Sequence, residues 1–166
     1  MSLSILSALQ LLYVAWLALA AGWDFLRMRI PNLLTGAIAV LFLLHGALHP
    51  FGTDWLSHLA AGLGMLIVVL PLFALGWIGG GDAKLLAAVA LWAGLWKLPL
   101  VLAVMGIAGG VLALMLIAFR PMLWGVVSKL LGERALPYLP RCMEPGTGIP
   151  YGVAIALGGA AILLQS

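Results

Sequence analysis

Long uncharged apolar stretches recur along the chain and limit the folds that are open to it. Residues 1–23 contain no charged side chain, and over the whole sequence 65% of residues are hydrophobic while only 8% are charged. A soluble domain of 166 residues lacks the interior needed to bury so much apolar surface. A lipid bilayer suits this composition as a solvent, which predicts an all-α integral membrane protein.

Charges and Gly/Pro clusters divide the chain into six apolar stretches, each a candidate transmembrane helix. A spanning helix needs roughly 20 apolar residues. The stretches are approximately residues 4–23, 32–49, 55–76, 83–97, 99–119 and 149–164. The fourth is short, so a re-entrant segment is an alternative to a full span. The first lacks the basic start of a secretory signal peptide and is expected to remain in the protein.

The longest connection, residues 120–148, divides into two parts. Its first part, "PMLWGVVSKLLG", has apolar residues at helical spacing together with Trp124 and Lys129, and predicts a helix along the cytoplasmic interface. The following "ERALPYLPRCMEPGTG" is rich in turn formers and predicts a loop. Cys142 in this loop is the single cysteine, which excludes an internal disulfide, and we interpret it as a bystander thiol.

The distribution of lysine and arginine predicts the orientation in the membrane. With six spans and the N-terminus outside, Lys97 is the one base of eight that lies outside. The bases inside are Arg27, Arg29, Lys84, Arg120, Lys129, Arg134 and Arg141. The positive-inside bias favours this orientation, with both chain ends extracytoplasmic. The bases form no cluster interleaved with aromatics, so we expect them to contact lipid headgroups and not nucleic acid.

Two aspartates interrupt the apolar sequence near predicted span ends. Asp24 ends the first span, where an interfacial acid balanced by Arg27 would explain it. Asp82 lies in "WIGGGDAKLLAA", where an N-cap for the next helix would explain the acid but not three glycines in a row. Glycine can take positive φ and lets another backbone approach closely, so the run indicates room for an extended peptide.

The predicted topology places both carboxylates on the cytoplasmic face, where they can act as a pair. Two carboxylates a few ångströms apart cannot both ionise readily, so one keeps its proton. The charged one can then take a proton from water while its partner donates to a peptide carbonyl. The alternatives are a small transporter or proton-relay subunit, which would hold acids at midplane depth, and a structural subunit in which Asp82 only caps a helix.

Three histidines offer a weaker hypothesis of a metal site. His45 and His49 lie four residues apart in "HGALH", and His58 follows at the start of the third span. They lie at the outer end of their spans, across the membrane from both aspartates, and lack the further ligand of a closed site. We therefore expect no metal and no other cofactor.

Three short motifs follow one another along nearly the whole chain. They are "DFLRMRIPN" at 24–32, "GGGDAKLL" at 79–86 and "GIPYGVAIALG" at 148–158. In order, spacing and six-span layout they resemble the type IV prepilin peptidases, which are membrane aspartic proteases of the GxGD class.

The resemblance implies roles for individual residues. Asp24 and Asp82 would be the catalytic pair. Gly79 and Gly81 would let the substrate backbone approach, with Gly80 and Lys84 in the same loop. Lys84 is two residues past Asp82 and would point elsewhere on a helix. The motif positions expected to give structural support are Pro31, Asn32, Pro150 and Gly152.

The resemblance also implies a substrate and a location. The substrate would be a prepilin with a short basic leader and one hydrophobic helix, cut after a glycine on the cytoplasmic side of a bacterial inner membrane. Members that also methylate the product carry an N-terminal domain with paired CxxC motifs, which is not found here. The chain is thus similar to the short, peptidase-only form of tight-adherence (Flp) pili, with one membrane-embedded domain over residues 1–166. The archaeal preflagellin peptidases are a related alternative.

Overall fold

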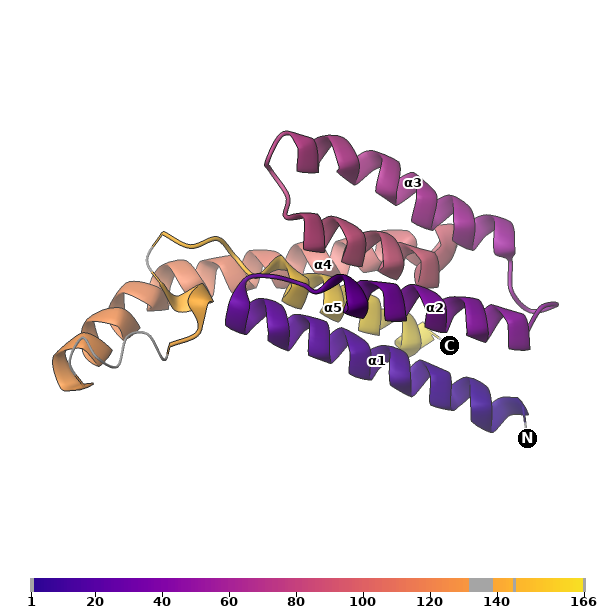
Figure 1. Cartoon of the computed structure of the whole chain (residues 1–166), viewed down its shortest axis with the longest axis horizontal. Helices are drawn as coiled ribbons and strands as arrows, with labels where there is room; N and C mark the ends of the chain where they lie inside the picture. Colours follow the sequence, from indigo (N-terminus) through magenta and orange to yellow (C-terminus); the bar gives the residue numbers. More distant parts are fainter. Residues whose placement is uncertain (1, 132–138, 145, 166) are drawn as a thin grey trace.

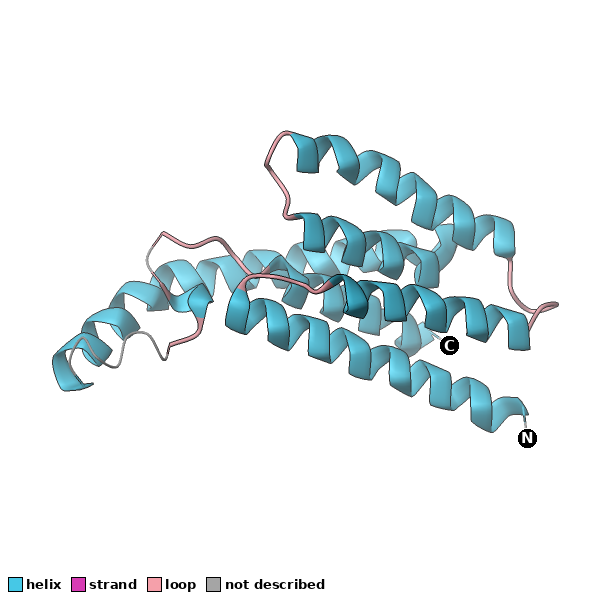
Figure 2. Ribbon diagram, viewed as in Figure 1, coloured by secondary structure: helices cyan, strands magenta, loops and turns pink. Residues whose placement is uncertain are grey.

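A computed structural model describes residues 2–131, 139–144 and 146–165, which form a bundle of helices (Figure 1). Helix α1 spans Ser2–Arg27, α2 spans Asn32–Leu48 and α3 spans Trp55–Ala74. The longest element, α4, spans Gly80–Leu131, and α5 spans Tyr151–Ala160. Short 3-10 helices lie before and after α5, η2 at Arg141–Met143 and η3 at Ala161–Gln165. The described residues contain no strand (Figure 2), which confirms the all-α prediction for them.

Local chemistry explains where the first helices begin and end. Helix α1 ends at Arg27 because Met28 takes the left-handed conformation, with φ 52°, while its N–H donates to the Asp24 carbonyl over 2.7 Å. Pro31 then takes the N-cap position of α2 with φ −62° and ψ 140°. Asp54 caps α3 by accepting a hydrogen bond of 3.1 Å from the Ser57 backbone N–H.

Helix α4 contains a sharp reversal at Gly94. This residue has φ 64° and ψ 176°, a conformation that is essentially restricted to glycine. Residues 80–93 run from the α3–α4 turn to the start of α3, where the Leu95 N–H donates to Ser57 Oγ over 2.9 Å. Residues 95–131 then run back along the bundle (Figure 1). Residues 80–93 thus have their two ends at opposite ends of the bundle, as a spanning segment would, and the complete crossing stays a prediction.

The predicted end of the fourth span lies a few residues after the observed reversal at Gly94. The predicted boundary between the fourth and fifth spans fell between Lys97 and Pro99, but both residues lie in the returning helix. Pro99 lies inside the returning helix, and the non-helical backbone conformation is at Gly94.

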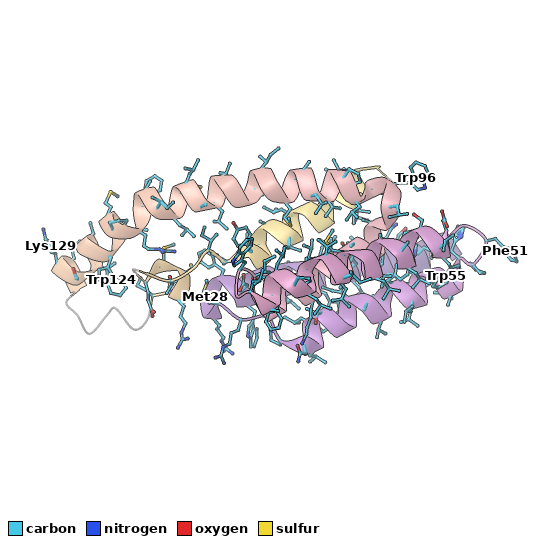
Figure 3. All side chains as sticks on the ribbon, turned by 90° about the horizontal axis from the view of Figure 1, so that it is seen from above. Met28, Phe51, Trp55, Trp96, Trp124 and Lys129 are labelled. Atoms are coloured by element: carbon cyan, nitrogen blue, oxygen red, sulfur yellow. The ribbon has the colours of Figure 1, made fainter. Side chains whose placement is uncertain are left out.

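The segment predicted to form a separate interfacial helix is instead the end of α4. The helix continues through Pro121 to Leu131 and extends past the other helices, and Figure 3 shows Trp124 and Lys129 on this extension. The helical spacing was interpreted correctly, but Pro121 did not mark a helix boundary. Part of the loop predicted to follow, residues 132–138, lies outside the described residues.

The outer surface supports a membrane protein. Within the described residues, three helices are long and apolar enough to cross a bilayer, Ile5–Arg27, Trp55–Ala74 and Gly80–Leu130, the last of which includes the reversal. Helix α2 and residues Tyr151–Leu164 form shorter apolar helices. Large apolar side chains such as Leu33, 75% exposed, and Ile67, 70% exposed, cover the outside of the bundle, as lipid contact requires.

Residues 80–93 occupy the centre of the bundle. Leu85 and Val89 are completely buried there. Near the end of this segment Trp92 stacks on Tyr13 of α1, with ring centroids 4.2 Å apart. The Trp92 indole N–H also donates to the Ile38 carbonyl of α2 over 2.8 Å. The first half of α4 is thus held by α1 and α2, and its other end carries Asp82.

Candidate active site

Asp24 lies in the last part of α1 and is only 5% exposed. Its Oδ2 accepts a hydrogen bond of 2.8 Å from the backbone N–H of Gly152. Gly152 is the second residue of α5, so this N–H is one of the free donors at a helix N-terminus, where the helix dipole favours negative charge. The contact joins residues 128 positions apart in the sequence.

The position of Gly152 leaves no room for a side chain beside Asp24. A Cβ atom at this position would lie 2.8 Å from Asp24 Oδ2 and 2.9 Å from Ile30 Cδ1, closer than real Cβ contacts. Pro150, at the N-cap of α5, is also completely buried. The two motif positions therefore define where α5 begins and how closely its first turn approaches the carboxylate.

Asp82 lies in the first turn of α4 and is partly buried. Together with Asp24 it lines a cavity of about 620 Å³. The two carboxylates are close enough to interact electrostatically. The rest of the lining is mostly apolar and includes Leu72, Trp77, Ile78, Leu86, Met105 and Ile155. Surroundings of this kind strengthen the interaction between the two acids, because little solvent screens it.

The three glycines before Asp82 serve close packing and not an unusual backbone conformation. None of the three has positive φ, and Gly80 and Gly81 already belong to α4. A Cβ at Gly79 would lie 2.9 Å from Asp82 Oδ2, and one at Gly81 would lie 3.0 Å from Ile30 Cβ. The expectation of positive φ was therefore wrong. The atoms that approach these two glycines closely belong to Asp82 and Ile30 of the same chain, and the room expected for a substrate peptide stays a prediction. Gly79 lines the cavity.

Lys84 lies on a different face of α4 from Asp82, and its partner Asn32 is the first residue of α2. Lys84 Nζ donates to Asn32 Oδ1 over 2.9 Å, which joins the start of α4 to the start of α2. Both residues line a separate groove between α2, α3 and α4. The structure thus places Lys84 away from the cavity that holds Asp82, as a spacing of two residues on a helix indicates.

Arg120, which the sequence indicated only as a base on the cytoplasmic side, fixes the segment before α5 through two hydrogen bonds. Arg120 Nη1 donates to the Thr147 carbonyl over 2.9 Å, and Nη2 donates to the Gly148 carbonyl over 3.1 Å. Gly148 lines the cavity, and the chain continues from it into α5 and Gly152. A planar guanidinium can bridge two carbonyls in this way. No pattern around Arg120 in the sequence indicated this role.

The histidines and the cysteine lie outside the cavity. His58 Nδ1 is 2.8 Å from the Leu91 carbonyl near the opposite end of the bundle, and the His45 ring packs on an indole of the core. In the part of the chain that the structure describes, no three His, Cys, Asp or Glu side chains are placed to hold a metal. Cys142 is completely buried in η2, and this burial raises the pKa of its thiol although the nearby Arg120 opposes the shift.

The fold and the site together define a class of protein. It is a helical membrane protein with two interacting carboxylates in an apolar cavity at one end of the bundle. Paired acids in such surroundings are suited to proton transfer.

The family follows from comparison with known proteins. The sequence profile of the type IV leader peptidase family matches residues 11–114, and the chain belongs to this family. It is therefore a protease of the leader-peptidase type, and the resemblance seen in the motifs is confirmed. The matched range includes Asp24 and Asp82 and ends before α5. Comparisons with curated proteins and with solved structures returned no significant match.

Proposed function

We propose that the protein is an aspartic endopeptidase that removes the leader peptide from Flp-like type IV prepilins. It cuts after a glycine at the cytoplasmic face of the inner membrane. The observation that carries this proposal is that Asp24 of α1 and Asp82 of α4 line one apolar cavity and interact electrostatically. Membership of the leader peptidase family supports the substrate class. Two carboxylates and one water supply all the groups that the hydrolysis needs.

The surroundings of the two acids suggest different roles for them. The Gly152 N–H and the N-terminus of α5 stabilise a negative charge on Asp24. Among the described residues, no hydrogen bond to the Asp82 side chain accompanies the electrostatic contact with Asp24. Asp24 is therefore the carboxylate that acts as general base, and Asp82 is the acid that holds the shared proton.

The reaction follows from these roles. Asp24 takes a proton from water as the water oxygen attacks the scissile carbonyl carbon, and Asp82 gives its proton to the carbonyl oxygen. The resulting diol collapses when its hydroxyl proton returns to Asp82 and Asp24 gives its proton to the leaving nitrogen. The C–N bond breaks, leaving a new carboxyl end on the leader and a new amino end on the pilin. Both aspartates regain their starting states.

The arrangement of the bases supports the cytoplasmic placement of the site. Arg27 at the end of α1 and Lys84 at the start of α4 lie at the same end of the bundle as the two aspartates. Lys97 donates to the Ile162 carbonyl over 3.4 Å at the other end. The positive-inside bias therefore favours a cavity on the cytoplasmic side.

Co-expression with a Flp-like prepilin tests the catalytic pair. Asp24→Asn and Asp82→Asn keep the size of each side chain but remove the carboxylate, so each variant should insert normally and leave the prepilin unprocessed on a gel. Asp54→Asn is a matched control, because asparagine caps a helix as well as aspartate does and Asp54 caps α3 at the other end of the bundle. Full processing by either cavity variant would refute the proposed pair.

Topology is tested separately. A reporter fused after residue 166 should respond as an extracytoplasmic domain, because six crossings return the chain to the side on which it began. A cytoplasmic response would contradict six crossings. It would not bear on the catalytic pair, which the co-expression experiment tests.

A further inference from the structure

A second hollow lies on the side of α4 opposite to the aspartates. It is a groove of about 480 Å³ between α2, α3 and the first half of α4. The α4 residues that line it are Lys84, Ala87, Ala88 and Leu91, whereas Asp82 and Leu86 line the other cavity. These two sets of positions follow the helical period, so residues 80–93 separate the two hollows.

The floor of this groove, called here the α2–α3 groove, is built from small residues. Gly36 and Ala39 of α2, Gly62 of α3 and Ala87 of α4 contribute to it. At Gly36 no atom lies within 4 Å of the place a Cβ would take, so the space above this glycine is open. At Gly62 a Cβ would meet Leu91 at 3.1 Å, so this glycine brings α3 and α4 together under the groove.

One end of the groove is positively charged. Lys84 is exposed and is the one charged residue in the lining. Its ammonium donates a hydrogen bond to the neutral Asn32 Oδ1, and no acid pairs with it among the described residues. Lys84 lies in the second turn of α4, at the end of the bundle that carries Asp24, so its ammonium is at the height where lipid headgroups meet the hydrocarbon.

We propose that the α2–α3 groove binds a phospholipid with a net negative headgroup, with an acyl chain along the groove and the phosphate beside Lys84. The apolar walls suit the acyl chain, and the unpaired ammonium suits the phosphate. The transmembrane helix of a prepilin fits less well. Its N-terminal end carries a positive helix dipole and follows a basic leader, and Lys84 would repel both.

The proposed site does not depend on catalysis. It rests on the groove, on Lys84 and on the membrane location, so its failure would leave the proposed peptidase activity untouched, and the reverse also holds.

Native mass spectrometry of the detergent-purified protein tests the proposal. The protein is incubated with equal amounts of phosphatidylglycerol and phosphatidylcholine that carry the same acyl chains. The wild-type protein should retain one phosphatidylglycerol in clear preference to phosphatidylcholine. Lys84→Gln can still donate a hydrogen bond to Asn32 but carries no charge, so it should lose at least about tenfold of this preference while still retaining some lipid.

A pair of glycine variants separates the groove from the rest of the surface. Gly36→Leu places a side chain in open space within the groove and should reduce retention of both lipids. Gly64→Leu on α3 is the control, because Gly64 also has no atom within 4 Å of its Cβ position and does not line the groove. It should retain phosphatidylglycerol like the wild type, and thermal unfolding should show that both variants are folded.

Three outcomes would overturn the proposal. They are equal retention of the two lipids by the wild-type protein, an unchanged preference in Lys84→Gln, and unchanged lipid retention in Gly36→Leu. The last outcome, combined with slower prepilin processing by the folded Gly36→Leu variant, would assign the groove to the substrate helix.

Discussion

The contact between Gly152 and Asp24 makes Gly152→Ala the most informative single substitution. The added methyl group would lie 2.8 Å from Asp24 Oδ2, whereas ordinary contacts begin at 3.4 Å, so the carboxylate or the first turn of α5 must move by about 0.6 Å. The N–H donor is kept, but the distance and direction of its hydrogen bond change. A catalytic group displaced by about 1 Å costs up to about 100-fold in rate, so we expect prepilin cleavage to slow by about 10-fold to 100-fold.

The same substitution should affect stability much less than rate. Overpacking costs roughly 1–3 kcal/mol. Replacing a glycine in a helix by alanine returns up to roughly 1 kcal/mol, because the unfolded chain loses less freedom. The two effects oppose each other, so the midpoint of thermal unfolding in detergent should fall only slightly. The loss of rate should then appear at temperatures where Gly152→Ala is fully folded.

Two other glycines supply controls for this measurement. Gly109→Ala places a methyl group at the ordinary distance of 3.4 Å from Ala154 and Tyr151, and it should leave both rate and stability near wild type. Gly158→Ala puts a methyl group 2.7 Å from the Val101 carbonyl, away from the aspartates. It should lower the unfolding midpoint more than Gly152→Ala does, because the contact is with backbone and not with a side chain that can move, and it should leave the rate of the folded protein unchanged. Cleavage by Gly152→Ala at the wild-type rate would refute the argument that this close contact positions Asp24.

Three further predictions concern the surroundings of the site and the reversal in α4. Arg120→Lys keeps the charge but cannot bridge two loop carbonyls, so we expect slower cleavage with little change in KM, whereas equal kcat for both proteins would contradict the positioning role. Burial raises the pKa of the Cys142 thiol, so little thiolate exists near pH 7. A maleimide should therefore label the folded protein slowly, faster as the pH rises, and the detergent-denatured protein at once. Rapid labelling of the folded protein would contradict the burial of this thiol. Gly94→Ala forces alanine into a conformation that only glycine adopts readily, so the free energy of unfolding should fall by about 1–3 kcal/mol, while Gly110→Ala, in open space within a helix, should not lower it.

The fold could be predicted from the sequence where hydropathy and turn residues agree. The first three helices match their predicted ranges closely, because Pro31 and Asp54 give local signals at their starts. The reversal in α4 could not be placed, because Pro99 and Gly94 are both helix-breaking residues in the sequence. Tertiary packing decides between them: Ser57 Oγ of α3 accepts the Leu95 N–H just after the turn.

The candidate site, like the fold, could be predicted only in part from the sequence. Asp24 and Asp82 could be singled out because a charged residue in an apolar stretch is unusual, and the charge distribution predicted that they share one membrane face. The motif at 148–158 marked Gly152 for structural support, but the hydrogen bonds by which Gly152 and Arg120 act at the site could not be foreseen. The Gly152 N–H and the Arg120 side chain act through contacts between distant parts of the chain, and neither leaves a periodic or compositional trace. The three glycines before Asp82 stood out in the sequence, but the fold depends on their small size and not on positive φ.

The bond between Asp24 and Gly152 has a consequence for the biosynthesis of the protein. Asp24 enters the membrane with the first helix and Asp82 with the fourth segment, so a nascent chain holds both acids well before it is complete. The donor that orients Asp24 belongs to α5, which leaves the ribosome after both aspartates. A chain cut short before residue 150 would carry both aspartates without the helix that positions one of them. If the two aspartates act as proposed, a truncated chain of this kind should cleave prepilin much more slowly than a chain that contains α5.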